Sequence, residues 1–343
     1  MLIILKIGTT NKQILRIIQG IEYLGFKARI SKGSQRTAVL VHGNIGYLDE
    51  SYFNKFEGIR KIIHISERLK MVYRENNPSD TVVNLGDGIK FGGKESHIIA
   101  GPCSVEDKDM IMETAGFLSS RGVKILRGGA FKPRTSPYSF QGLQEKGLVY
   151  LADAAAKHNM KIVSEAMDEY SLKLMAETAD IIQIGARNMQ NYSLLKKCGQ
   201  LDKPILLKRG FNATLDDLLV SLEYILSEGN TNVIVCERGI RMYGASKQRS
   251  ILDLIGLSDF KNISHLPIIV DPSHCTRDRS KVPNLAKAAM IYGCDGLMVE
   301  VHPNPDQALS DGPQSLTFNQ FDKLLIDLKK LSKMSEKPLR IFD

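Results

Sequence analysis

Short apolar runs alternate with amphipathic helical patterns from about residue 97 onward, and this alternation limits the fold more than any other feature. Each run is followed by a glycine or polar turn and then by a helical pattern, as in 317–334, where Phe318 and Phe321 recur at helical spacing. Such alternation predicts parallel strands joined by crossover helices. The predicted strands are 97–103, 124–129, 161–166, 180–186, 204–210, 232–239, 266–274 and 296–302.

The number and spacing of these units favour a closed barrel. Eight strand–helix units over roughly 250 residues are typical of an α/β fold of the (β/α)8 TIM-barrel type. The alternative is a doubly wound open sheet, which for a dinucleotide site would carry G-x-G-x-x-G after its first strand. The loop in that place reads "GPCSVED". We therefore predict the barrel, with polar strand ends facing a common mouth.

The N-terminal part follows a different order. Residues 1–65 read as β-α-β-β-α-β, which predicts a small ferredoxin-like α+β domain. The stretch "ENNPSDTVVNLGDG" is rich in turn formers, so residues 66–94 are predicted to be a linker, with one short strand at 81–85. The barrel is predicted to occupy 95–343.

Composition restricts the class of protein. The 343 residues include five cysteines without paired spacing, which argues for a reducing compartment and against a disulfide framework. The apolar start "MLIILK" is too short for a signal peptide, and no later run reaches membrane-spanning length, so we predict a cytoplasmic protein without a membrane partner. The net charge is +8, but the lysines and arginines are dispersed among 38 acidic residues. That dispersion favours small acidic ligands over nucleic acid.

Cations recur where the predicted strands end. Four of them follow strands two, four, five and six, and a fifth lies in the loop after strand two. Guanidinium and ammonium groups bind phosphate and carboxylate oxygens, and a mouth shielded from water strengthens that attraction. A single cation at the end of a strand is commonly just solvated by water. Its recurrence at several strand ends predicts a site for a multiply charged anion. The residues are Arg127, Arg187, Lys208, Arg238 and Lys132.

A second group of polar residues ends strands one, seven and eight, which become neighbours when the barrel closes. Cys103, His274 and Glu300 are those ends, and Asp311 lies in the following loop "SDGPQS". A thiolate, an imidazole and two carboxylates suit a divalent transition metal better than calcium or magnesium. The alternative for each residue is structural, because free cysteines are usually core residues and a histidine after "DPS" can simply brace a loop.

The remaining histidines and cysteines carry weaker signals. His302 shares a face with Glu300, so it is predicted to support the metal site or to contact substrate. Cys275, next to His274, stays open between packing and the site. His97, His158 and His265 are predicted to be structural or exposed, and Cys198, Cys236 and Cys294 are assigned to packing.

Several motifs together resemble one family. In order along residues 95–318, the segments "AGPCSVE", "LRGGAFKPRTSPYSFQG", "QIGARNMQN", "LLKRG", "CERG", "VDPSH" and "EVHPNPDQALSDGPQSL" resemble those of 3-deoxy-D-arabino-heptulosonate 7-phosphate (DAHP) synthases. These enzymes begin the shikimate pathway of aromatic amino acid biosynthesis. The N-terminal domain is similar to the ferredoxin-like regulatory domain of some members with this short barrel.

The resemblance implies a reaction and a role for each matching residue. Phosphoenolpyruvate would condense with erythrose 4-phosphate and release phosphate, with C3 of phosphoenolpyruvate attacking the aldehyde and water adding at C2. A divalent ion (Mn, Fe, Co or Zn) would be held by Cys103, His274, Glu300 and Asp311. Phosphoenolpyruvate would be bound by Arg127, Lys132, Arg187, Lys208 and Arg238. Erythrose 4-phosphate would meet Arg134, Thr135 and Ser136, while Glu165 would lie near the attacking water and Lys132 would assist proton transfer.

The resemblance also implies partners and leaves alternatives. The N-terminal domain would bind Tyr or Phe as a feedback ligand in a homo-oligomer, a dimer or a tetramer. Where family members commonly have a glycine-containing segment followed by adjacent arginines, this chain has "CTRDRSKV", which leaves the roles of Arg277 and Arg279 open. The alternatives are a 3-deoxy-D-manno-octulosonate 8-phosphate synthase acting on arabinose 5-phosphate, and a non-catalytic phosphosugar-binding regulator.

Overall fold

The computed structural model describes residues 2–32, 37–42, 50–63, 69–133, 136–242 and 250–342. The chain divides into two compact units, Met1–Arg68 and Leu69–Asp343, and each is described by itself. Among the described residues, no helix has both the length and the apolar character needed to cross a membrane.

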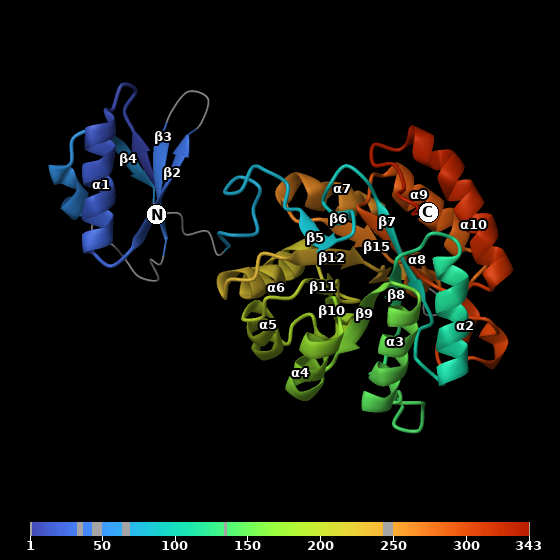
Figure 1. Cartoon of the computed structure of the whole chain (residues 1–343). Helices are drawn as coiled ribbons and strands as arrows, with labels where there is room; N and C mark the ends of the chain where they lie inside the picture. The colour runs from blue at the N-terminus through green and yellow to red at the C-terminus, as the bar shows by residue number, and fades with distance from the viewer. Residues whose placement is uncertain are drawn as a thin grey trace. The chain divides into compact units, whose positions relative to one another are not determined.

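The first unit is an antiparallel sheet of strand order β2-β3-β1-β4 with a helix (Figure 1). The order of elements confirms the ferredoxin-like prediction, although the second helix is a short 3-10 turn. Thr10 and Gln13 cap the start of α1 reciprocally, and buried residues such as Ile17 and Phe53 fill the space between helix and sheet. The elements are β1 (Leu2–Leu5), α1 (Asn11–Tyr23), β2 (Lys27–Lys32), β3 (Thr37–His42), η1 (Glu50–Lys55) and β4 (Ile59–Ile63).

The second unit contains a closed barrel of eight parallel strands, as predicted. Consecutive strands pair with each other, and β16 closes the ring onto β7. The strands are buried almost throughout, which explains why their sequences read as continuous apolar runs. They are β7 (His97–Gly101), β8 (Ile125–Arg127), β9 (Lys161–Ala166), β10 (Ile181–Ile184), β11 (Ile205–Lys208), β12 (Val233–Glu237), β15 (Ile268–Val270) and β16 (Gly296–Glu300).

Helices surround this barrel (Figure 1). Most begin at a side chain that accepts a backbone N–H, such as Asp107, Asp168, Thr214 and Thr317. The α-helices are α2 (Lys108–Ser119), α3 (Glu145–Lys157), α4 (Glu169–Thr178), α5 (Tyr192–Gly199), α6 (Leu215–Ser227), α7 (Leu254–Ile263), α8 (Pro272–Thr276), α9 (Val282–Ile291) and α10 (Phe318–Leu331). Short 3-10 helices are η2 (Ala186–Asn188), η3 (Pro305–Gln307), η4 (Gly312–Gln314) and η5 (Ser332–Met334), and β13 (Ile240–Arg241) pairs with β14 (Ser250–Ile251).

Several strands are shorter than predicted, because their polar ends belong to the loops. The clearest difference is the run 266–274, where β15 stops at Val270 and His274 lies in α8. The side chain of Asp271 accepts the backbone N–H of His274 and starts this helix, with Pro272 in its first turn. His274 therefore projects from a helical turn above the strand.

Residues 69–94, which belong to the stretch predicted as a linker, pack with the barrel. The contact boundary falls between Arg68 and Leu69, and a hairpin of β5 (Val83–Gly86) and β6 (Ile89–Phe91) follows. Val83, Ile89 and Phe91 belong to the same apolar cluster as the inward-facing residues of the barrel strands. The ring of Phe91 lies beside Gly296, the first residue of β16, so the hairpin covers the barrel at the amino ends of its strands.

This covering predicts a large contribution of Phe91 to stability. Phe91→Ala would empty a fully buried site and lower the free energy of unfolding by about 3–5 kcal/mol, the range for phenylalanine truncation in a core. Urea unfolding followed by circular dichroism measures this difference. Val82→Ala, at a neighbouring position that is 46% exposed, is the control and should change stability by no more than about 0.5 kcal/mol. Equal effects of both substitutions would contradict the packing of the hairpin.

Candidate active site

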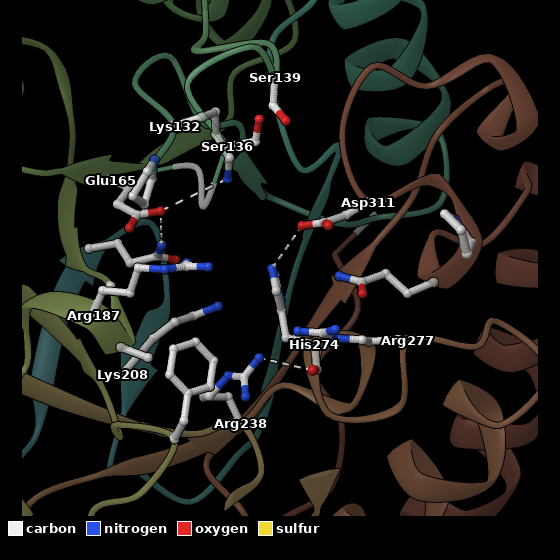
Figure 2. A pocket seen from close by; sticks show the side chains of 17 residues that line it. Lys132, Ser136, Ser139, Glu165, Arg187, Lys208, Arg238, His274, Arg277 and Asp311 are labelled. Carbon is white, nitrogen blue, oxygen red and sulfur yellow. Dashed lines mark hydrogen bonds and ion pairs between the residues drawn. The ribbon is translucent and has the colours of Figure 1, made fainter. Parts of the chain in front are cut away.

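A cavity of about 380 Å³ opens at the carboxyl ends of the barrel strands (Figure 2). Charged side chains from opposite sides of the barrel line it, as the sequence predicted for the mouth. They include Lys132, Glu165, Arg187, Lys208, Arg238, His274, Arg277 and Asp311. In barrels of this type, residues at this end are where binding and catalysis take place.

A regular alternation along the strands brings polar side chains to the layer that lies in and beneath this cavity. Inward-facing apolar residues form one layer of the barrel, and the polar side chains lie two positions further along, one layer nearer the mouth. Ile125 is followed in this way by Arg127, and Leu206 by Lys208. The same step leads to Glu165, Gln183, Arg238, Asp271 and Glu300.

Three predicted anion-binding residues gather on one side of the cavity. Lys208 ends β11, Arg238 follows β12, and Arg187 lies in η2 after β10. The guanidinium groups of Arg187 and Arg238 lie 5.4 and 4.5 Å from the centre of the Phe211 ring. Lys208 and Arg238 are 4–5% exposed, and burial lowers the pKa of Arg238. Concentrated, partly desolvated positive charge of this kind favours a multiply charged anion.

Lys132 and Glu165 face each other across a neighbouring part of the cavity. Lys132 Nζ lies 3.9 Å from Glu165 Oε2, which also accepts a hydrogen bond of 3.2 Å from the side-chain amide of Gln183. Burial opposes the charge of Lys132, but the neighbouring Cys103 and Glu165 outweigh burial and raise its pKa. Lys132 therefore remains protonated. A Cβ at Gly185 would lie 2.0 Å from Glu165 Oε1, so a larger residue there would displace this carboxylate from its present position.

Arg127 occupies a different place from the other predicted cations. Its side chain is buried inside the barrel, does not line the cavity, and donates a 2.5 Å hydrogen bond to Glu300 Oε1. Burial opposes the charge of Arg127, but Glu300 and the other acidic neighbours together outweigh burial and raise the pKa of Arg127. Its predicted contact with an anionic substrate stays a prediction.

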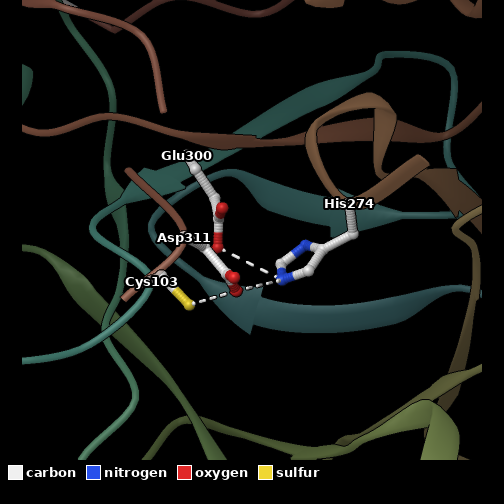
Figure 3. A group of neighbouring side chains, drawn as sticks. All are labelled: Cys103, His274, Glu300 and Asp311. Atoms are coloured by element: carbon white, nitrogen blue, oxygen red, sulfur yellow. Dashed lines mark hydrogen bonds and ion pairs between the residues drawn. The ribbon is translucent and has the colours of Figure 1, made fainter. Parts of the chain in front are cut away.

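The four predicted metal ligands converge (Figure 3). The sulfur of Cys103, one ring nitrogen of His274 and one oxygen each of Glu300 and Asp311 all lie within 4.8 Å of one another. His274 Nε2 is 3.2 Å from Glu300 Oε1 and 3.8 Å from Asp311 Oδ2, and Cys103 Sγ is 3.0 Å from Asp311 Oδ2. One sulfur, one nitrogen and two carboxylate donors fit a transition-metal ion.

Polar partners orient these ligands. Asp271, which is fully buried, accepts from His274 Nδ1 at 2.7 Å and from Lys208 Nζ at 2.5 Å, so His274 presents Nε2 to the cluster. Burial would raise the pKa of Asp271, but His274 and Lys208 outweigh it and hold this pKa well below the usual value. Gln314 donates to Glu300 Oε2 at 2.6 Å.

The sequence reasoning missed Asp271, Gln183 and Gln314. A signal existed for the first two, because each lies two positions after an inward-facing apolar residue, Ile269 and Ile181. Gln314 has no comparable signal, since it lies in η4 and reaches Glu300 only through the folding of its loop.

The five cysteines fall into two groups, Cys103 in the ligand cluster and the other four outside it. Burial raises the pKa of the Cys103 thiol, so a bound metal would have to displace its proton. Cys275 is buried outside the cluster and donates to the carbonyl oxygen of Ser250, 3.6 Å away. Cys198, Cys236 and Cys294 are buried in the apolar core, in agreement with the packing prediction.

The other singled-out residues fall in several places. Ser136 lines the cavity, whereas Arg134 and Thr135 lie outside the described residues. Arg277 lines the cavity from a left-handed backbone conformation, with φ of 53°. Arg279 donates to Asp306 at 2.7 Å and to the carbonyl oxygen of Gly312 at 3.0 Å, so it ties the segment after α8 to the loop that carries Asp311.

Fold and site together indicate a (β/α)8-barrel enzyme. Its site is suited to anionic substrates and lies beside a cluster of potential metal ligands. Residues 75–337 match the DAHP synthetase I family, and residues 1–67 match the DAHP synthase ferredoxin-like domain. The chain therefore belongs to the DAHP synthetase I family. The reaction of this family condenses phosphoenolpyruvate with erythrose 4-phosphate to give DAHP and phosphate, the first step of the shikimate pathway.

Individual relatives agree with this assignment. The chain is 49% identical to a phospho-2-dehydro-3-deoxyheptonate aldolase of Thermotoga maritima over 97% of this chain and 98% of that protein. A crystal structure of the DAHP synthase of Thermotoga maritima superposes with a TM-score of 0.78 at 47% identity, covering 99% of both chains. A 2-dehydro-3-deoxyphosphooctonate aldolase of Francisella tularensis is 31% identical over 70% of this chain and 92% of that protein. The octulosonate enzyme is thus a more distant relative.

The ligand cluster predicts a spectroscopic result. Co²⁺ added to the metal-free protein should give an absorption band of thiolate-to-cobalt charge transfer, because Cys103 supplies the sulfur. Cys103→Ser should abolish the band and weaken Co²⁺ binding by at least about tenfold, the smaller effect known for residues that only support metal ligands. Cys198→Ala, which removes a buried thiol outside the cluster, is the matched control. A band that persists in Cys103→Ser would exclude this thiol as a ligand.

Proposed function

We propose that Cys103, His274, Glu300 and Asp311 hold a divalent metal ion during the DAHP synthase reaction. The mixed sulfur, nitrogen and oxygen donors favour Mn²⁺, Fe²⁺, Co²⁺ or Zn²⁺. When bound, such an ion supplies Lewis acidity toward the aldehyde oxygen of erythrose 4-phosphate. The observation that carries the proposal is that His274 and Asp311 of this cluster line the same cavity as the buried cations Lys208 and Arg238.

The buried cations are proposed to bind phosphoenolpyruvate. Arg187, Lys208 and Arg238 offer charge-assisted hydrogen bonds to its phosphate and carboxylate groups, with Arg127 as a further partner within the barrel. Their positive charge also meets the oxyanions that form while C3 attacks the aldehyde and phosphate leaves C2. Because the cations are held by the barrel before substrate arrives, little reorganisation accompanies the reaction.

Lys132 and Glu165 are proposed to manage protons and water beside the reacting carbons. Lys132 holds a proton on Nζ within the cavity and can donate it to a phosphate oxygen as charge develops. Glu165 is positioned by Gln183 and by Lys132. Its carboxylate can orient the water that adds to C2. Ser136 lies at the cavity edge, where it would receive erythrose 4-phosphate together with Arg134 and Thr135.

The two alternatives from the sequence are less well supported. An octulosonate 8-phosphate synthase shares the barrel chemistry, but the relatives of that kind match at 30–31% identity against 49% for the heptulosonate enzyme. A non-catalytic phosphosugar-binding regulator has no use for the ligand cluster, whose members lie within 4.8 Å of one another. Phosphate release from phosphoenolpyruvate, assayed with each aldose phosphate in turn, distinguishes all three functions.

The proposed anion site predicts the effect of Arg238→Ala. The substitution should raise KM for phosphoenolpyruvate about tenfold or more, because a charge-assisted hydrogen bond is worth about 1.5–3 kcal/mol. It should also lower kcat, since the same guanidinium meets developing negative charge. Steady-state phosphate release at saturating erythrose 4-phosphate measures both constants. Arg241→Ala removes an exposed arginine of β13 and should leave them unchanged. A selective change in KM for erythrose 4-phosphate would contradict the assignment.

We further propose that the N-terminal unit controls the barrel. None of the described ligand or cavity residues of the active site comes from residues 2–63. The match to the DAHP synthase ferredoxin-like domain supports binding of a feedback ligand, Tyr or Phe, in a homo-oligomer that is a dimer or a tetramer. Regulation then requires that the amino acid prefers one of two arrangements of the chain. Stabilising the oligomer is the alternative role.

This proposal predicts the behaviour of a truncated protein containing residues 69–343. A truncated DAHP synthase of Thermotoga maritima has a solved structure, 50% identical over 78% of this chain. The truncated barrel should retain turnover because it keeps the whole site, and it should lose inhibition by Tyr or Phe. Initial rates of both proteins, with and without each amino acid, provide the comparison. Inhibition that persists after truncation would place the regulatory site in the barrel.

A further inference from the structure

A buried imidazole and a buried carboxylate face each other near the metal-ligand cluster. His302 Nε2 lies 3.6 Å from Glu106 Oε2, and the two side chains are 7% and 9% exposed. Neither residue lines the active-site cavity. Among the described atoms, His302 Nε2 has no partner within hydrogen-bond distance, which is costly for a buried polar atom unless the site has a use for it.

The hydrogen bond at the other ring nitrogen defines what His302 offers to Glu106. Its Nδ1 accepts the backbone N–H of Asn304 at 3.0 Å. A neutral imidazole with an accepting Nδ1 carries its proton on Nε2. The N–H of His302 therefore faces Glu106 Oε2, and the pair consists of a matched donor and acceptor.

The second oxygen of Glu106 reaches two further segments. Glu106 Oε1 accepts the backbone N–H of Leu309 at 2.9 Å and the hydroxyl of Ser104 at 3.4 Å. Leu309 precedes Asp311 by two positions, and Ser104 directly follows Cys103. His302 in turn follows Glu300 by two positions. The pair thus touches each of the three segments that supply Cys103, Glu300 and Asp311.

One of these segments depends on such contacts for its position. Asp311 lies between the short turns η3 and η4, in a left-handed conformation with φ of 53°. Its side chain makes no capping hydrogen bond to η4, and its Oδ2 lies 3.0 Å from Cys103 Sγ. Ser310, beside it, has its hydroxyl 3.3 Å from Cys103 Sγ. A metal site tolerates errors of only about 0.2 Å in ligand distance, so this loop must be held against the Cys103 segment.

We propose that Glu106 and His302 form a positioning pair that holds the Asp311 loop and the Cys103 segment in the geometry that binds the metal. The inference rests on the proposed metal function of the cluster. It gives His302 the supporting role that the sequence left open beside substrate contact. Residues that hold metal ligands typically change metal affinity by about 10–100-fold when replaced.

Two substitutions in the full-length protein test the pair. Glu106→Gln keeps an oxygen for the N–H of Leu309 but turns an amide N–H toward His302. His302→Asn keeps an acceptor near the N–H of Asn304 and removes Nε2. Each should raise the dissociation constant of Co²⁺ by about 10–100-fold and shift the Cys103 charge-transfer band. The double variant should bind Co²⁺ no more weakly than the single variant with the lower affinity, because both substitutions break the same interaction.

A control separates positioning from general loop stability. Asp306→Asn removes an ion pair with Arg279 on the same loop, at a side chain that is 81% exposed. It should leave Co²⁺ binding and the spectrum unchanged. Melting temperatures of the metal-free Glu106→Gln and Asp306→Asn proteins should agree with that of the wild type within about 2 °C, since an exchange of isosteric polar groups removes no apolar packing.

Three outcomes would overturn the inference. Wild-type affinity and spectrum in both single variants would show that the pair does not position the ligands. Loss of affinity in Asp306→Asn, or in step with a lowered melting temperature, would show a general effect of loop stability. A wild-type protein that binds no Co²⁺ would remove the proposed metal function itself, and the positioning role with it.

Discussion

The buried carboxylate of Asp271 is the contact on which the site depends most. A fully desolvated charge is strongly unfavourable unless partners compensate for it, and Asp271 has two, Lys208 and His274. One partner belongs to the cation group and the other to the metal-ligand cluster. Asp271 therefore fixes the orientation of His274 and the position of Lys208 at once, and it connects the cations of the cavity with the cluster of potential metal ligands.

The barrel geometry permits this arrangement because it directs charged residues that are adjacent in sequence to opposite faces of a strand. Lys208 faces inward above Leu206, whereas Arg209 faces the surrounding loops, where it binds Glu237 at 2.9 Å and Asp253 at 2.8 Å. Successive side chains of a strand point to opposite faces. The "LKRG" segment thus supplies one cation to the cavity and one to the structure that supports the loops.

Much of the fold and of the site followed from the sequence. The eight barrel strands and the ferredoxin-like order were predictable, because buried parallel strands leave continuous apolar runs between helical patterns. The four ligands of the cluster were predictable from strand order, since closure makes the first and last strands neighbours. Of the β5–β6 hairpin, only the first strand was predicted, at 81–85; its pairing with β6 was not, because strands this short show little periodicity and gain their stability from packing on the barrel end.

The sequence by itself determined which chemical groups stand at the strand ends: cations after one set of strands, and a thiol, an imidazole and carboxylates after another. Only the tertiary structure decided which of them meet. Arg127 pairs with Glu300, 173 positions away, while Lys208 turns to the cavity and to Asp271. The local pattern at both cations is the same, an apolar strand ending in positive charge. Their partners differ because side-chain contacts across the barrel depend on register and burial, which no local pattern records.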